Sequence, residues 1–453
     1  MKSKILQVLS LFVFIIFISN SAYSQWTIAG AVSGAGTYPS ISVVDQNTAW
    51  VAGGTNTPSI FRTTNGGTSW QTIPTTGINL DVFCVWAVDA NTAYVGDGGA
   101  AGGAGGNASF YKTTNAGVNW TTVASTGGTA GFFNGIVFSK TNPMFGVAQS
   151  DPPTGTGQAY YLSITTNGGT NWNPASPQPP GISGTASAQN SIIVIDNMFY
   201  GFGGNALPSR AYLTSNGGAN WYVGTLAGLS GGFVCGLAFS SDKQYGIAAT
   251  SASLPSIART TDGGLTWSTV NIGSGFTGYC TCKWIEGTNT CYISAATGSA
   301  GVVKKSTDRG LTWTTMTTSG LTGITHMEFK KVGTTVYGYA ATGNGAILKV
   351  TDLVTGVNTL NSAIPSEFVL EQNYPNPFNP TTTINFSIPF ASNVTIKVYN
   401  ALGKEVSELV NEFKNPGNYS VDFTAGSDLS SGIYYYTLKA DNFVQTKKLM
   451  LVK

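Results

Sequence analysis

The chain has 453 residues, of which only 9% are charged: 22 are Lys or Arg and 20 are Asp or Glu, for a net charge of +2. Average globular chains carry about 25% charged residues, so this chain is unusually uncharged. It has no long Lys- or Arg-rich run and therefore lacks the positive patch that nucleic-acid binding requires. Its 58 Gly residues indicate many turns.

The first 24 residues have the pattern of an export signal. Lys2 and Lys4 precede an apolar run over 5–18, and Ala22-Tyr23-Ser24 places small residues where a signal peptidase reads. The run is shorter than the roughly 20 residues of a membrane-spanning helix. We therefore predict a signal peptide over 1–24, a mature chain that starts at Gln25 and no integral membrane segment after cleavage. The alternative is an uncleaved membrane anchor.

One eight-residue pattern recurs six times between residues 63 and 313, at steps of 46 to 52 residues. In each copy, called a repeat turn below, Asn or Asp is followed two residues later by Gly and three residues after that by Trp. The Asn or Asp side chain accepts backbone N–H groups, Gly permits positive φ, and Trp packs between neighbouring sheets. The residues that define the six repeat turns are Asn65, Gly67, Trp70, Asn115, Gly117, Trp120, Asn167, Gly169, Trp172, Asn216, Gly218, Trp221, Asp262, Gly264, Trp267, Asp308, Gly310 and Trp313.

A weaker, aromatic-bearing repeat lies upstream of each repeat turn and occurs seven times. Each unit then contains four antiparallel strands in about 45 to 50 residues, the size of a propeller blade. The expected seventh turn keeps Asp352 but has no Trp, whereas Trp26-Thr27-Ile28 looks like a fourth strand without its three predecessors. We predict a seven-bladed β-propeller over 25–352 whose N-terminal strand completes blade seven.

The repeat turns resemble the Asp-box, or BNR repeat, of sialidase-type and sortilin-type propellers. The blade arrangement is similar to that of the photosystem II assembly factor family and of xyloglucanase propellers. The resemblance implies a fold rather than an activity, and in those families Asp-boxes on the outer rim serve turn geometry.

The segment over 367–453, after a polar linker over 353–366, differs in pattern from the repeats. Alternating apolar and polar residues over 394–398 and 419–423 predict half-buried strands of a small Ig-like β-sandwich. The fold class predicted for the whole chain is therefore all-β: a seven-bladed β-propeller followed by a small Ig-like β-sandwich.

This segment resembles the type A C-terminal sorting domain of the type IX secretion system of Bacteroidota. The resemblance includes the motif Asn373, Tyr374, Pro375, Asn376, Pro377, Phe378, Asn379 and Pro380. It implies that the type IX secretion machinery is a partner and that the protein is secreted, extracellular or on the outer cell surface. An ordinary Ig-like binding module is the alternative.

Residues suited to catalysis are sparse. A lone histidine, His326, is more typical of a structural core residue than of a metal ligand or nucleophilic triad, so we expect no metal and no cofactor. Sialidases resembling this chain hold their substrate with three arginines. Three of the four arginines here adjoin or lie in repeat turns, so only Arg210 remains and an arginine triad cannot be assembled, which disfavours that activity.

Five cysteines occur in the chain: Cys84, Cys235, Cys280, Cys282 and Cys291. Cys84, Cys235 and Cys282 occupy equivalent first-strand positions, as small core residues do. Because an exported chain meets oxidising conditions, a disulfide from Cys291 to Cys280 or Cys282 across one hairpin is an open alternative.

Charged loop residues gather on the rim opposite the repeat turns. Asp81, Asp97 and Asp151 come from blades two and three, and Arg210 comes from blade four. A glycosidase needs two carboxylates that flank the scissile bond, so the three Asp are the candidate catalytic residues. Asp97, Asp151 and Arg210 are the candidate ligand-binding residues. The alternative is that all four are solvated loop charges.

These features predict a monomeric, exported protein that binds a glycan or a protein, as in adhesion, without catalysing a reaction. One alternative is an extracellular glycoside hydrolase of the xyloglucanase type. Another is a scaffold that resembles the assembly factors.

Overall fold

The structure, a computed structural model, describes residues 25–452 except for some short segments. Those segments are 55–56, 79, 101–105, 155–156, 182–185, 207, 227–228, 230–231, 252–256, 273–279, 298–299, 317–322, 355–364, 366, 390–391, 415–416, 427 and 441–442. The predicted signal peptide over 1–24 and most of the predicted linker lie outside the described residues.

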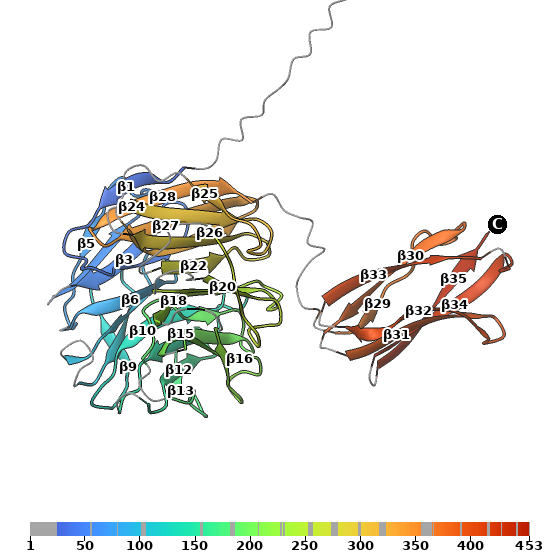
Figure 1. Ribbon diagram of the computed structural model, residues 1–453, viewed down its shortest axis with the longest axis horizontal. Coiled ribbons are helices and arrows are strands. Elements are labelled where there is room, and N and C mark those ends of the chain that lie inside the picture. The colour runs from blue at the N-terminus through green and yellow to red at the C-terminus, as the bar shows by residue number, and fades with distance from the viewer. Residues whose placement is uncertain are drawn as a thin grey trace, which may run out of the picture.

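The described residues form two all-β bodies, a ring of blades and a sandwich (Figure 1). Blade one contains β2 (Ser40–Val43), β3 (Ala49–Gly54), β4 (Pro58–Thr63) and β5 (Gln71–Ile73). Blade two contains β6 (Val82–Ala87), β7 (Ala93–Asp97), β8 (Ser109–Thr113) and β9 (Thr121–Ser125). Blade three contains β10 (Phe133–Phe138), β11 (Gly146–Ser150), β12 (Tyr161–Thr165) and β13 (Asn173–Pro174).

The remaining blades repeat this order of strands. Blade four contains β14 (Ile193–Val194), β15 (Tyr200–Ala206), β16 (Arg210–Thr214) and β17 (Tyr222–Thr225). Blade five contains β18 (Gly232–Phe239), β19 (Gly246–Thr250), β20 (Ile257–Thr260) and β21 (Ser268–Thr269). Blade six contains β22 (Cys280–Trp284), β23 (Cys291–Thr297), β24 (Ala300–Ser306) and β25 (Thr314–Met316). Blade seven contains β26 (Ile324–Val332), β27 (Thr335–Thr342), β28 (Ala346–Leu353) and β1 (Thr27–Ala31).

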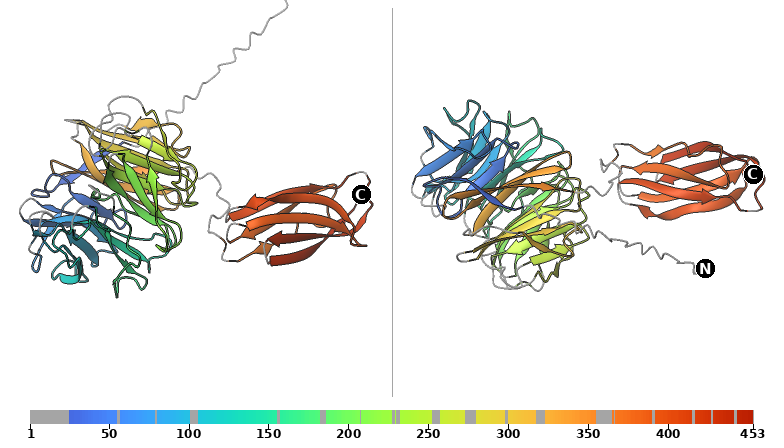
Figure 2. Two further views of the ribbon diagram at one scale, coloured as in Figure 1. Left: turned by 60° about the horizontal axis from the view of Figure 1, so that its bottom comes forward. Right: turned by 90° about the horizontal axis from the view of Figure 1, so that it is seen from above.

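The N-terminal strand closes the ring, which confirms the predicted seven-bladed architecture. Strand β1 pairs with β28 through Thr27 opposite Lys349 and Ile28 opposite Leu348. Trp26, just before β1, is fully buried in the core of blades six and seven. Because the first and last parts of the propeller share one sheet, the strand edges that an open array would expose are paired (Figure 2).

The repeat turns have one geometry, shown here for blade one. The hydroxyl of Thr63 accepts a hydrogen bond from the N–H of Gly67, and Asn65 Oδ1 accepts one from the N–H of Ser69, four residues on. Gly67 has φ +83, and a Cβ there would lie 2.8 Å from the Cβ of Ala29 in the neighbouring blade. A close approach as well as positive φ therefore requires glycine at this position.

The tryptophans of the repeat turns pack between blades, as the sequence predicts. Trp70 Nε1 donates to the carbonyl of Ala29 in blade seven, and Trp120 Nε1 donates to that of Pro74 after blade one. Since alternate loops of a meander lie on one face, the repeat turns share a face with the loops between the first and second strands of each blade. We call it the repeat-turn face and the other the opposite face.

The C-terminal body consists of two antiparallel sheets. One contains β29 (Val369–Leu370), β30 (Thr381–Ile388) and β33 (Gly417–Thr424). The other contains β31 (Ser392–Asn400), β32 (Glu405–Lys414), β34 (Gly432–Ala440) and β35 (Phe443–Leu451). One hydrophobic core joins residues of both sheets, which confirms the predicted sandwich.

The sorting motif packs against this sandwich. Phe378 lies in its core, and Asn373 donates through Nδ2 to Thr382 Oγ1 while its backbone N–H donates to Tyr436 Oη. Asn376 Oδ1 accepts from the N–H of Met450 in the last strand. These bonds explain why the motif needs amide side chains at those positions.

Candidate functional site at the mouth of the central channel

A buried carboxylate lies on the innermost strand of blade seven. In β26, Met327 and Phe329 face the hydrophobic core of blades six and seven, so the alternation of the strand gives His326 and Glu328 the other face. Glu328 Oε2 forms an ion pair at 2.7 Å with Nζ of Lys283, which lies on β22 of the adjacent blade. Lys283 pairs with Tyr292 of the second strand in blade six, and Glu328 pairs with Tyr339 of the second strand in blade seven. The two charged residues therefore lie at the same level of the ring.

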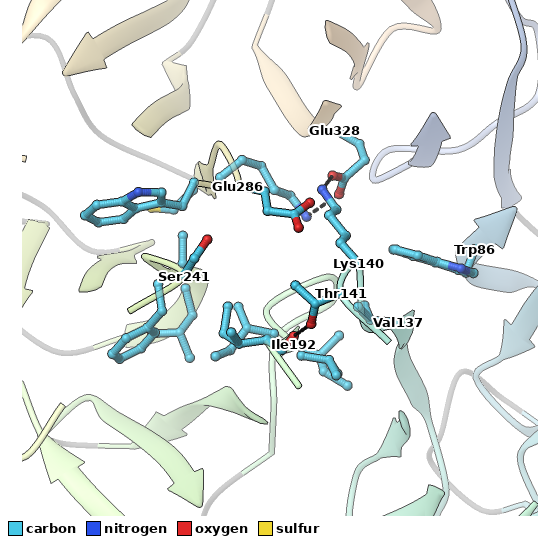
Figure 3. A pocket seen from close by; sticks show the side chains of 17 residues that line it. Trp86, Val137, Lys140, Thr141, Ile192, Ser241, Glu286 and Glu328 are labelled. Carbon is cyan, nitrogen blue, oxygen red and sulfur yellow. Dashed lines mark hydrogen bonds and ion pairs between the residues drawn. The ribbon is translucent and has the colours of Figure 1, made fainter. Parts of the chain in front are cut away.

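A second lysine reaches the same carboxylate from across the ring. Lys140 belongs to the loop between β10 and β11 of blade three, and its Nζ lies 2.9 Å from Glu328 Oε1. It also donates to the carbonyl of Phe329 at 3.3 Å. Figure 3 shows the Lys140 side chain extending across the cavity toward Glu328. This ion pair therefore joins blades that are not neighbours in the ring.

The charges of Lys140 and Lys283 keep the carboxyl group of Glu328 ionised. Burial by itself would raise the pKa of Glu328, but the ammonium groups of Lys140 and Lys283 hold that pKa well below its ordinary value. Burial, together with the nearby charge of Lys283, lowers the pKa of His326 to about 3. At neutral pH the site therefore contains a carboxylate, two ammonium groups and a neutral imidazole. The Nδ1 of His326 accepts from the N–H of Ile41 at 3.0 Å.

The innermost strands of the seven blades surround a central channel. Two cavities flank the Lys140–Glu328 ion pair at the mouth of this channel. The first, of about 90 Å³, is walled largely by apolar side chains of blades four to six, among them Ile192, Ile195 and Leu237. The second, of about 170 Å³, lies toward blades one to three. Trp86, Lys140 and Glu328 line both cavities, so the ion pair and the indole divide one mouth into two parts. Gly168 of a repeat turn lines the second cavity, so the mouth opens on the repeat-turn face.

The acidic residues predicted from sequence lie on the opposite face. Asp97, the last residue of β7, is fully buried and accepts hydrogen bonds from the N–H groups of Gly99 and Ser109 and from the hydroxyl of Tyr111. Burial raises the pKa of Asp97, and these hydrogen bonds oppose the rise. The carboxylate thus holds the two ends of the loop between β7 and β8.

Asp151 has a similar arrangement in blade three. It accepts from the N–H and hydroxyl of Ser187 at 2.7 and 2.9 Å and from Asn134 Nδ2 at 2.8 Å. Burial raises the pKa of Asp151 to about 6. Asp97 and Asp151 therefore accept hydrogen bonds from two separate sets of donors. Carboxylates bound in this way are suited to anchoring loops.

The other two predicted residues lie near the same face. Asp81 directly precedes β6 and is half-buried, and Arg210 is the first residue of β16. Among the described residues, no group of three or more His, Cys, Asp or Glu side chains is arranged to hold a metal ion.

The structure describes all five cysteines, each buried and without a disulfide. Cys84, Cys235 and Cys282 lie in the innermost strands of their blades, as expected. Cys291 stands opposite Trp284 in the β22–β23 pair, whereas Cys280 and Cys282 stand opposite Ala295 and Ile293. This register keeps Cys291 away from both proposed partners, because a disulfide needs nearly opposed Cβ atoms.

The charged mouth of the channel was not among the sites predicted from the sequence. Lys140, Lys283 and Glu328 are far apart in the chain, and they come together only when the ring closes. One local signal was present: the strand sequence ITHMEF over 324–329 places a Glu and the single His on one face of an innermost strand. In a chain with so few charges, a carboxylate at that position requires a partner.

Comparison with known proteins distinguishes the two bodies. Residues 372–453 match the family described as "Secretion system C-terminal sorting domain". No curated protein matches the chain. Among the described residues, no helix has the length and apolar character needed to cross a membrane.

Similar solved structures are propellers. An ancestral GH74 enzyme is 14% identical over 95% of this chain, with a TM-score of 0.52, and the chain covers only 64% of that enzyme. A chain of the mitotic checkpoint complex is 11% identical over 78% of this chain and 99% of its own length, with a TM-score of 0.50. YCF48 bound to D1 peptide is 16% identical over 74% of this chain and 98% of its own length, with a TM-score of 0.47.

At these identities the likeness concerns the fold alone, and it agrees with the propeller described above. The sorting domain in turn indicates a secreted or outer-surface protein. The chain is thus a β-propeller that carries a C-terminal sorting domain of the type IX secretion system.

Proposed function

We propose that this protein is a non-enzymatic binding module of the cell surface or the extracellular space, and that its ligand binds at the mouth of the central channel on the repeat-turn face. The ligand is a protein segment that combines an apolar side chain with an acidic group. Type IX secretion delivers the propeller to the location where it meets this ligand.

The observation that carries the proposal is the composition of the two cavities. The first cavity combines aliphatic side chains such as Ile192 and Leu237 with the indole of Trp86. The second combines Val43 and Val44 with the same indole. Binding sites for ligands are typically concave and apolar, with a few polar groups that fix orientation. Branched aliphatic walls suit an apolar protein side chain better than they suit a hydroxyl-rich sugar.

The charges at the mouth support an acidic ligand. Three lysines line the cavities, Lys140, Lys283 and Lys330, against the two glutamates Glu286 and Glu328. Lys283 is largely buried behind Glu328, whereas the Lys140 side chain is 39% exposed. An incoming carboxylate would therefore meet the exposed Lys140 and Lys330 rather than Lys283.

The arrangement on the opposite face favours binding over hydrolysis. A glycosidase of the xyloglucanase type would need two of Asp81, Asp97 and Asp151 to face one scissile bond. Asp97 accepts three hydrogen bonds from its own loop and strand and is fully buried, and Asp151 accepts three from Ser187 and Asn134. Carboxylates engaged in this way are suited to anchoring loops.

The test is selection of a phage-displayed random peptide library on the immobilised full chain, followed by affinity measurement. We expect peptides that place Asp or Glu beside Leu, Ile or Phe. In Lys140→Met, which keeps the aliphatic stem, affinity for these peptides should fall about tenfold, as for loss of one charge-assisted contact.

The matched control is Lys304→Met, because Lys304 donates to Thr315 Oγ1 near the outer edge of blade six. This variant should bind like the unmodified protein. Equal losses in both variants, or peptides without an acidic residue, would contradict the proposed site. Saturable binding on a glycan array that Lys140→Met leaves unchanged would favour a lectin. Release of sugars from a polysaccharide that Asp151→Asn abolishes would favour the hydrolase.

A further inference from the structure

The innermost strands of blades five and six meet at a pair of cysteines. Cys235 lies on β18 and Cys280 begins β22, and their sulfur atoms are 2.8 Å apart. The backbone N–H of Cys280 also donates to Sγ of Cys235 at 3.1 Å. Both side chains are buried. The two thiols therefore point at each other across the interface between blades.

The backbones approach closely at the same place. A Cβ added to Gly236, the residue after Cys235, would lie 2.8 Å from the backbone nitrogen of Cys282. The absence of a side chain at Gly236 lets β18 pack directly against the backbone of β22. Disulfides require Cα atoms within about 7 Å of each other, and this approach brings the two strands into that range.

The remaining cysteines are less well placed. Cys280 and Cys282 are two residues apart on one strand, so one of them at most can face Cys235 directly. Cys291 is separated from Cys280 by four positions of register in the β22–β23 pair. Cys84 lies in blade two, in a different core cluster.

We propose that Cys235 and Cys280 form a disulfide between blades five and six in the exported protein. In this reaction the two thiols lose two protons and two electrons as the S–S bond forms. A disulfide-bearing oxidant of the cell envelope accepts them by thiol–disulfide exchange and is reduced to a dithiol. The sorting domain supports the required setting, because disulfides persist in secreted proteins.

Burial determines when the bond forms. Burial raises the pKa of the Cys280 thiol well above its ordinary value, so in the folded propeller this thiol stays neutral. Because the thiolate is the nucleophile of exchange, the folded, reduced protein should resist oxidation. The bond therefore forms before blades five and six close over it.

The bond would link residues 45 positions apart in the chain. Such a link stabilises a protein chiefly by restricting its unfolded chain. We expect the oxidised protein to have an equilibrium constant for unfolding about a hundredfold lower than the reduced protein.

The experiment is peptide mapping of the full chain, purified from cells that export it. Free thiols are alkylated in denaturant without reductant, and the protein is then cleaved with trypsin. Cleavage after Lys and Arg gives peptide 211–243, which contains Cys235, and peptide 260–283, which contains Cys280 and Cys282. We expect these two peptides to be linked and to separate on reduction.

Two variants assign the partner. The link should persist in Cys282→Ala and disappear in Cys280→Ala. Alkylation of all five thiols in the unmodified protein would overturn the proposal without any variant. So would persistence of the link in Cys280→Ala, or a link to peptide 284–304, which contains Cys291.

Discussion

On the opposite face of the propeller, Asp97 is held by two backbone N–H groups and one hydroxyl, all within 14 residues along the chain. At the mouth of the channel, Glu328 is held by two ammonium groups from blades three and six. Both carboxylates are buried, but neutral local donors stabilise one and distant charges stabilise the other. The first arrangement shapes a loop, whereas the second depends on the closed ring.

Removal of the charge at Glu328 should give the largest effect. Glu328→Gln leaves Lys283, whose side chain is only 17% exposed, without its anion. Loss of one partner of a buried ion pair destabilises by roughly 3 to 5 kcal/mol, so the free energy of unfolding should fall by about 3 kcal/mol. Urea denaturation followed by tryptophan fluorescence measures this change.

The control for this comparison is Asp97→Asn. The amide oxygen of Asn can still accept the N–H groups of Gly99 and Ser109, so the loss should be only about 1 kcal/mol. Equal losses of unfolding free energy in Glu328→Gln and Asp97→Asn would contradict the difference drawn between the two carboxylates.

The imidazole at the channel gives a pH dependence of defined sign. The pKa of His326 is about 3 in the folded protein because the group is buried, whereas the unfolded chain takes up this proton near its ordinary value of 6.5. Between these values the unfolded chain binds more protons, so stability is complete above about pH 6.5 and falls as the pH is lowered toward 3. The variant His326→Gln should not show this part of the loss of stability at low pH. Melting temperatures of both proteins at pH 7 and pH 4.5 test the prediction, and identical pH profiles would refute it.

Asp151 should give a smaller effect of opposite sign on the other face. Burial raises its pKa to about 6 in the folded protein, above the ordinary value of 3.8. Between these values the folded state binds more protons, so this group favours folding more strongly as the pH falls from 6 to 4. Asp151→Asn keeps an oxygen that can accept from Ser187 but removes the titration. The difference between the melting temperatures of this variant and the unmodified protein should therefore change across this window, and a constant difference would contradict the role assigned to burial.

Local patterns in the sequence determined the blades. Each repeat turn needs only its own hydroxyl, its Asn or Asp and its Gly, so the sequence alone predicts the fold of the turn and the place of the next strand. The unpaired fourth strand at 27–31 likewise predicted closure of blade seven, because a blade without a partner strand would leave an open edge. The sorting motif was also recognisable from the sequence, because its residues are contiguous.

The channel mouth could not be read from the sequence, because its residues are distant in the chain and their levels in the ring depend on strand register. Lys140 lies 188 residues before Glu328 and reaches it only because the closed ring places the loop of blade three across from blade seven. The loop acids Asp97 and Asp151 looked available in sequence, but in the folded structure both carboxylates accept several hydrogen bonds and Asp97 is fully buried. Local hydrogen bonding therefore specifies the blades from sequence alone, while closure of the ring decides which charges meet.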